Sequence, residues 1–130
     1  GSTACICFDI FKAYADNFLI EHRELLKKLL DALLPEKLIE APEMPRTATT
    51  ALTKNARHTV FHVKSTYAEH KMIRGIIEEH VYMKSVPVSL AGEYQVYALP
   101  EMVKVESRTE NGRTLFETGD FLGYKAFLLK

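Results

Sequence analysis

The sequence predicts an α+β protein, with one amphipathic helix and a leading strand ahead of a small antiparallel β-sandwich or barrel of about five to seven strands. Three observations predict this fold: an unbroken apolar run at residues 3–8, a helical apolar repeat over residues 18–34, and short alternating segments after residue 45. We place the boundary near Pro45. It divides a strand and helix with their linker, residues 1–45, from an antiparallel β-domain, residues 46–130.

The run at residues 3–8 reads Thr-Ala-Cys-Ile-Cys-Phe, without polar alternation. Such a run is typical of a strand that is covered on both faces of a parallel sheet. Since no other segment reads this way, we expect the strand to present an open edge and to pair with the β-domain or with a second copy of the chain. Cys5 and Cys7 are the only cysteines, and we predict that both are buried, unbridged thiols.

A helix is predicted from Phe18 to Leu34, because apolar residues recur at three- and four-residue spacing on one face. Asn17 is the predicted N-terminal cap, and Pro35 disfavours helical geometry at the residue before it. The apolar stripe consists of His22, Leu25, Leu26, Leu29, Leu30, Leu33 and Leu34.

The β-domain is predicted from short alternating runs, including a Pro87-containing run that favours an edge strand. Asn111-Gly112 is the pair preferred in a two-residue hairpin turn. The first half of the segment Tyr67–Met83 is predicted as loop or helix that covers an open end of the sheet. The predicted strands are residues 47–53, 59–64, 85–90, 94–99, 103–106, 114–117 and 124–129. The predicted core is Val60, Val86, Val88, Val96, Val103, Val105, Leu115, Phe127 and Leu129.

Charge and hydropathy exclude several classes of partner. Lys and Arg number 17, as do Asp and Glu, so the formal net charge is zero and provides no field to attract nucleic acid. No apolar stretch approaches the roughly 20 residues that span a bilayer, and no basic segment precedes an apolar signal core. We therefore expect a cytoplasmic protein without a nucleic-acid or membrane partner.

The chemistry-bearing residues form no specific motif. His58, His62, His70 and His80 lack a diagnostic metal-ligand spacing, so structural or surface roles are favoured over a metal site. Glu78 and Glu79 are adjacent, and in a strand they point to opposite faces, which does not suit the two carboxyl groups of a glycosidase.

Short acids and tyrosines also have simpler explanations. Asp9, Tyr14 and Asp16 follow the predicted first strand, where open parallel sheets bind ligands, but capping is the favoured role for both acids. Tyr94, Tyr97 and Tyr124 are candidates for a sugar-stacking patch, with core or rim packing as the default. We predict no catalytic residue, cofactor or metal ligand, and the ligand-binding residues stay unknown.

Several stretches nevertheless have a recognisable pattern: residues 7–14, 22–26, 33–35, 57–63, 76–79, 86–88 and 97–100, together with the closing strand. They resemble a known family, the β-galactosidase-like glycoside hydrolases. The N-terminal part resembles the end of their flavodoxin-like trimerisation domain, and the rest resembles their small C-terminal β-domain. The resemblance implies a catalytic barrel upstream, so none of that family's catalytic residues is transferred to this chain.

We therefore expect a non-catalytic accessory or assembly region of a β-galactosidase-like glycosyl hydrolase. Its expected partner is a second copy of the chain, as a homo-oligomer, or the upstream domains of its own parent chain. The alternative is a free-standing β-module that binds carbohydrate or protein. A small enzyme with a histidine metal site is a third interpretation, which an elemental analysis would test.

Overall fold

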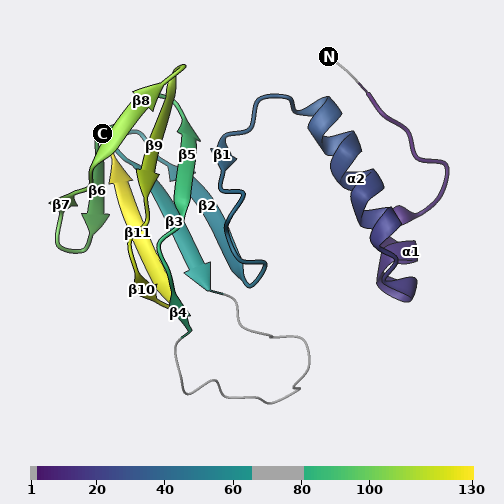
Figure 1. Ribbon diagram of the computed structural model, residues 1–130. Coiled ribbons are helices and arrows are strands. Elements are labelled where there is room, and N and C mark those ends of the chain that lie inside the picture. Colours follow the sequence, from purple (N-terminus) through teal and green to yellow (C-terminus); the bar gives the residue numbers. More distant parts are fainter. Residues whose placement is uncertain (1–2, 66–80) are drawn as a thin grey trace. The chain divides into compact units, whose positions relative to one another are not determined.

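A computed structural model describes residues 3–65 and 81–130 (Figure 1). The chain divides into two compact units, residues 1–37 and 38–130, so Pro42 and Pro45 belong to the second unit. Two helices followed by antiparallel sheets confirm the predicted α+β class. The predicted segment Tyr67–Met83 lies mostly outside the described residues, and its end forms strand β4.

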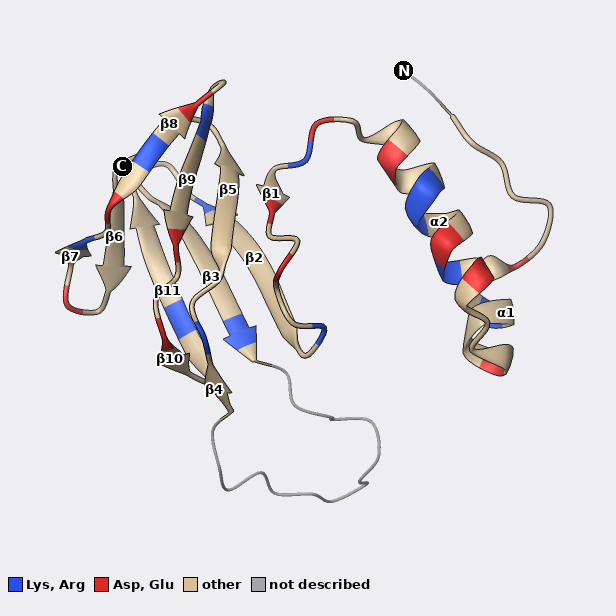
Figure 2. Ribbon diagram, viewed as in Figure 1, with Lys and Arg blue, Asp and Glu red and all other residues tan. Residues whose placement is uncertain are grey.

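The first unit contains two helices where the sequence predicted one. Helix α1 spans Ile10–Asn17 and α2 spans Ile20–Leu33. Phe18 adopts a left-handed conformation with φ +51° and donates its N–H to the carbonyl of Tyr14 at 2.8 Å, which ends α1. Helix α2 confirms the predicted amphipathic helix and ends before Pro35, as the proline requires. Acidic and basic residues alternate along it (Figure 2).

Two local predictions in this unit are wrong. Leu19 precedes α2 without a side-chain cap, while the Asn17 side chain donates to the carbonyl of Ala13 at 3.0 Å within α1. Residues 3–8 form no strand. A strand needs a neighbour for its backbone groups, and every strand pair in the described part of the chain joins residues of the second unit.

The second unit is a β-sandwich whose described strands all pair antiparallel. One sheet has the order β1-β5-β9-β8 and the other β2-β3-β11-β6-β7, while β10 and β4 form a short pair. The strands are β1 Ile39–Glu40, β2 Ala48–Lys54, β3 Thr59–Ser65, β4 Tyr82–Met83, β5 Pro87–Ala91, β6 Val96–Leu99, β7 Val103–Lys104, β8 Ser107–Glu110, β9 Arg113–Glu117, β10 Phe121–Leu122 and β11 Tyr124–Leu129.

Described strands outnumber the predicted five to seven because several of them, such as β1 and β10, have two residues and leave no alternating pattern in the sequence. The Asn111-Gly112 turn joins β8 to β9 as predicted. Both residues have positive φ, +51° and +72°, as a type I′ turn requires.

Aromatic side chains from both sheets meet in the core. The ring of Phe116 on β9 lies 5.0 Å from that of Phe127 on β11 and 6.0 Å from that of Phe61 on β3, measured between centroids. Leu90 and Val96 are fully buried beside them. The two sheets therefore pack face to face.

The predicted core is partly correct. Val86, Val88, Val96, Phe127 and Leu129 are buried, whereas Val60 and Val105 are half-buried. Leu115 is also only half-buried, because β9 turns Thr114 and Phe116 inward instead. Val103 is 59% exposed on the two-residue edge strand β7.

Pro87 does not mark an edge strand, because β5 lies between β1 and β9. It is the first residue of β5, and β1 pairs only with Ser89 and Leu90. The missing N–H of Pro87 therefore leaves no ladder bond unmade on that side.

Candidate functional site

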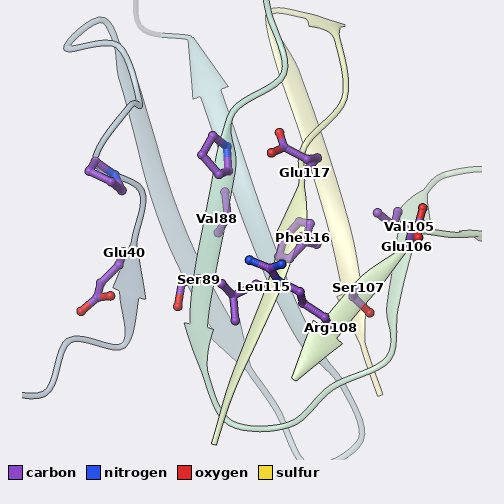
Figure 3. A pocket seen from close by; sticks show the side chains of 12 residues that line it. Glu40, Val88, Ser89, Val105, Glu106, Ser107, Arg108, Leu115, Phe116 and Glu117 are labelled. Atoms are coloured by element: carbon purple, nitrogen blue, oxygen red, sulfur yellow. The ribbon is translucent and has the colours of Figure 1, made fainter. Parts of the chain in front are cut away.

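A groove of about 730 Å³ crosses the four-stranded sheet (Figure 3). Its lining combines apolar side chains with three glutamates and one arginine, so acidic groups outnumber basic ones. The lining residues are Glu40, Pro42, Pro87, Val88, Ser89, Val105, Glu106, Ser107, Arg108, Leu115, Phe116 and Glu117.

Strand register brings the polar lining residues to one face. Glu40 lies opposite Ser89, and Arg108 lies opposite Leu115, and directly opposed residues point to the same side of a sheet. Pro87 and Glu117 form the next such pair. The face opposite the core is therefore a ladder of polar groups around Leu115.

Arg113 fixes the position of two of these groups. Its Nε donates to the Ser89 hydroxyl at 2.7 Å and its Nη2 to the Ser89 carbonyl at 3.1 Å. The same Nη2 lies 3.6 Å from Oε2 of Glu40. A guanidinium holds a planar set of donors, so this contact ties β1, β5 and β9 together across the face.

A second hydrogen-bonded cluster supports Glu117. The Ser85 hydroxyl donates to Oε2 of Glu117 at 2.8 Å and accepts from the Gly119 N–H at 3.0 Å. The Ser85 N–H donates to Asp120 at 2.8 Å. The Tyr82 hydroxyl also donates to Asp120, and this bond is the main reason that the pKa of Asp120 lies below its ordinary value and the pKa of Tyr82 above its own.

The three candidate tyrosines do not form one platform. Tyr94 is half-buried and packs against the core. The Tyr97 hydroxyl donates to Gln95 at 2.9 Å, and the Lys130 ammonium lies 5.1 Å from its ring centroid. Tyr124 is 55% exposed and stacks on His62.

The Tyr124 ring is held by a defined hydrogen-bond chain. Nδ1 of His62 lies 2.7 Å from the Tyr124 hydroxyl and Nε2 lies 2.8 Å from the Thr53 hydroxyl. The Thr53 hydroxyl also lies 3.4 Å from the carbonyl of Val60, so the ring of His62 bridges Thr53 and Tyr124. His62 therefore serves as an orienting group.

The remaining candidate residues have structural roles or lie outside the described residues. His58 precedes β3 and is exposed. His70, His80, Glu78 and Glu79 fall among residues 66–80, which the structure does not describe. Within residues 3–65 and 81–130, no group of three or more His, Cys, Asp or Glu side chains is arranged to hold a metal ion.

In the helical unit, Asp9 has the favoured capping role, since its carboxylate accepts from the Lys12 N–H at 2.9 Å. Asp16 forms an ion pair with Lys12. Tyr14 packs edge-on against Phe18 at 6.2 Å.

Both cysteines are exposed, so the prediction of buried thiols is wrong. Its basis was the strand at residues 3–8, which the described chain does not form. Without neighbouring strands to cover that run, Cys5 and Cys7 stay in contact with solvent.

No helix in the described part of the chain is both long and apolar enough to cross a membrane. No protein-family model matches the sequence, and no curated protein matches it either. Among solved structures, α-L-fucosidase isoenzyme 2 from Paenibacillus thiaminolyticus has the same fold, with a TM-score of 0.81 and 22% identity. The match covers 96% of this chain and only 20% of the fucosidase.

Proposed function

We propose that this chain is a non-catalytic accessory region of a larger glycoside hydrolase. The observation that carries the proposal is the shared fold, which includes nearly the whole chain but a fifth of a fucosidase. The sequence resemblance favours a β-galactosidase-like enzyme as the parent. That finer assignment rests on the short stretches quoted above, and the fucosidase likeness supports only a glycoside hydrolase.

The helical unit supports an assembly role. Large apolar side chains stand in solvent on both helices and their flanks: Phe11 is 70% exposed, Phe18 77% and Leu34 60%. Soluble proteins seldom leave such groups clustered in water unless another surface covers them. We infer that the rest of the parent protein, or a second copy, covers this unit.

The gene tests the proposal most directly. A catalytic glycosidase barrel encoded in the same reading frame is the expected result, and a complete gene that encodes no hydrolase domain would contradict the proposal. Thiol labelling tests the assembly role, because Cys5 and Cys7 are exposed here. Both should react more slowly in the intact parent than in this chain, and equal rates would argue against a covered helical unit.

Saccharide binding in the groove is a second candidate function. The groove has apolar lining side chains with carboxylates, a serine and an arginine at its rim. This combination suits the ring faces and the hydroxyls of a neutral sugar. Calorimetric titration with neutral oligosaccharides should detect binding that is weakened by Leu115→Glu, which replaces an apolar lining side chain by a charged carboxylate. Leu122→Glu, at an exposed position outside the lining, is the matched control.

A further inference from the structure

Among the described strands, β2 is one edge of the five-stranded sheet and pairs on one side only, with β3. The other edges of the two large sheets, within the described residues, are the two-residue strands β1 and β7 and the charged strand β8, which carries Arg108 and Glu110. By contrast, β2 pairs with β3 over seven consecutive residues, contains neither Pro nor Gly, and has its only charge at Lys54, its last residue. Long, uncharged edges are templates for another strand.

The turn between β2 and β3 determines which backbone groups face outward. The Asn55 N–H donates to the carbonyl of His58 at 2.9 Å, which makes Asn55 and His58 a hydrogen-bonded pair. Such pairs alternate with non-hydrogen-bonded ones in an antiparallel ladder. Alternation from Asn55 along β2 places Ala51 among the residues whose backbone N–H and C=O groups bond to β3. Thr50 and Leu52 lie between such residues, so their N–H and C=O groups point away from β3.

We propose that β2 pairs antiparallel with β2 of a second copy across a two-fold axis at Ala51. Opposed residues must have side chains on the same face. An axis at Ala51 meets this condition and lets the two copies of β2 overlap along their whole length. Each Thr50 then exchanges both backbone hydrogen bonds with Leu52 of the other copy. The two five-stranded sheets become one continuous sheet.

Side chains near the axis are compatible with this pairing. Thr49, Ala51 and Thr53 lie on the exposed face of β2, and all three are small and uncharged, so the two copies meet without like-charge repulsion. Ala51 faces Ala51 of the second copy at a non-hydrogen-bonded position, where opposed Cα atoms lie about 4.5 Å apart. Self-complementarity over the full strand favours a second copy over a foreign strand. The proposal goes beyond the accessory function and does not depend on it.

A charge-swap experiment on the full chain tests the pairing. Ala51→Lys and Ala51→Glu each place like charges opposite one another, and each should weaken the dimer by about tenfold or more in sedimentation equilibrium. An equimolar mixture of the two variants should restore dimerisation. Val103→Lys, on the opposite edge of the same sheet, is the control and should leave the dimer intact.

Amide hydrogen exchange provides a second measurement. The Thr50 and Leu52 amides should be protected in concentrated wild-type protein and exchange freely in Ala51→Lys, whereas the amide of residue 51, which bonds to β3, should stay protected in both proteins. Thr50→Pro should also abolish the dimer without unfolding the chain, because that N–H is not used by β3. A strictly monomeric wild type overturns the proposal. So does a dimer that tolerates all three variants, which would indicate association through another surface such as the helical unit.

Discussion

Replacing Thr114 with Val tests how the chain crosses from one sheet to the other. The Thr114 side chain is fully buried. Its hydroxyl donates to the carbonyl of Gly92 at 2.8 Å and accepts from the Tyr94 N–H at 2.8 Å. Residues 92–94 form the start of the connection between β5 in one sheet and β6 in the other. Thr114 therefore provides the hydrogen-bond partner of two backbone groups in this connection, the Gly92 carbonyl and the Tyr94 N–H.

The magnitude follows from the two partners that lose their hydrogen bonds. Leaving a buried polar group unpaired costs about 1–3 kcal/mol, while the added methyl group of valine recovers roughly 0.8 kcal/mol. Since Gly92 and Tyr94 are only half-buried, we expect a net loss of about 2 kcal/mol in the free energy of unfolding. For a domain of this size that corresponds to a fall of about 8–16 °C in Tm.

Urea and thermal unfolding of the full chain, followed by near-UV circular dichroism, measure this loss. Thr109→Val is the control, because it makes the same chemical change at an exposed position on β8 and should change stability by less than about 0.5 kcal/mol. If Thr114→Val were as stable as this control, the Thr114 hydroxyl would not be holding the connection.

Three further predictions concern turns and acid stability. Gly112→Ala should destabilise by about 1–2 kcal/mol from its positive φ alone, since nothing lies within 4 Å of the added Cβ; no change in urea midpoint would refute this. Gly92→Ala should cost more, because its Cβ would lie 2.7 Å from the Tyr94 ring at φ +105°, and an equal cost would contradict the steric argument. Asp120 has a lowered pKa, so its stabilisation is present above pH 3.8 and is lost as pH falls through the lower folded-state pKa. Tyr82→Phe should therefore raise the pKa of Asp120 in an NMR titration and reduce Tm more at neutral than at acid pH; an unmoved pKa would refute it.

Local signals in the sequence predicted the elements that depend on neighbouring residues. The Asn111-Gly112 turn, helix α2 before Pro35, and the alternating strands β3 and β11 all form where expected. The leading strand at residues 3–8 failed because pairing is not a local property, and its composition alone is compatible with an exposed segment.

Alternation predicted strands better than it predicted their buried faces. In β9, Thr114 and Phe116 alternate with Leu115 and Glu117, and a polar threonine faces the core. Alternation along a strand does not determine which of the two sets of side chains faces the core when each set contains one apolar residue. The burial of Phe116, with its larger apolar surface, decides between them.

The candidate groove could not have been found from the sequence. Glu40, Ser89 and Arg113 look like ordinary solvent-facing positions, and only the order β1-β5-β9 brings them together. The available signal was weak: polar residues at alternate positions of β5 and β9 marked the face opposite the core. The open edge at β2 was equally invisible, because edge status depends on which strands pair.

The groove and the β2 edge lie on different sheets of the sandwich, so the second unit can use one without blocking the other. No residue of β2 lines the groove, and the Thr50 and Leu52 backbone groups point along their own sheet toward a new strand. A second copy on β2 would thus extend the five-stranded sheet while the polar ladder of the four-stranded sheet stayed accessible. Dimerisation and groove binding should therefore be thermodynamically independent unless the core between the sheets has two packings, and the fully buried rings of Phe61 and Phe127 favour a single one.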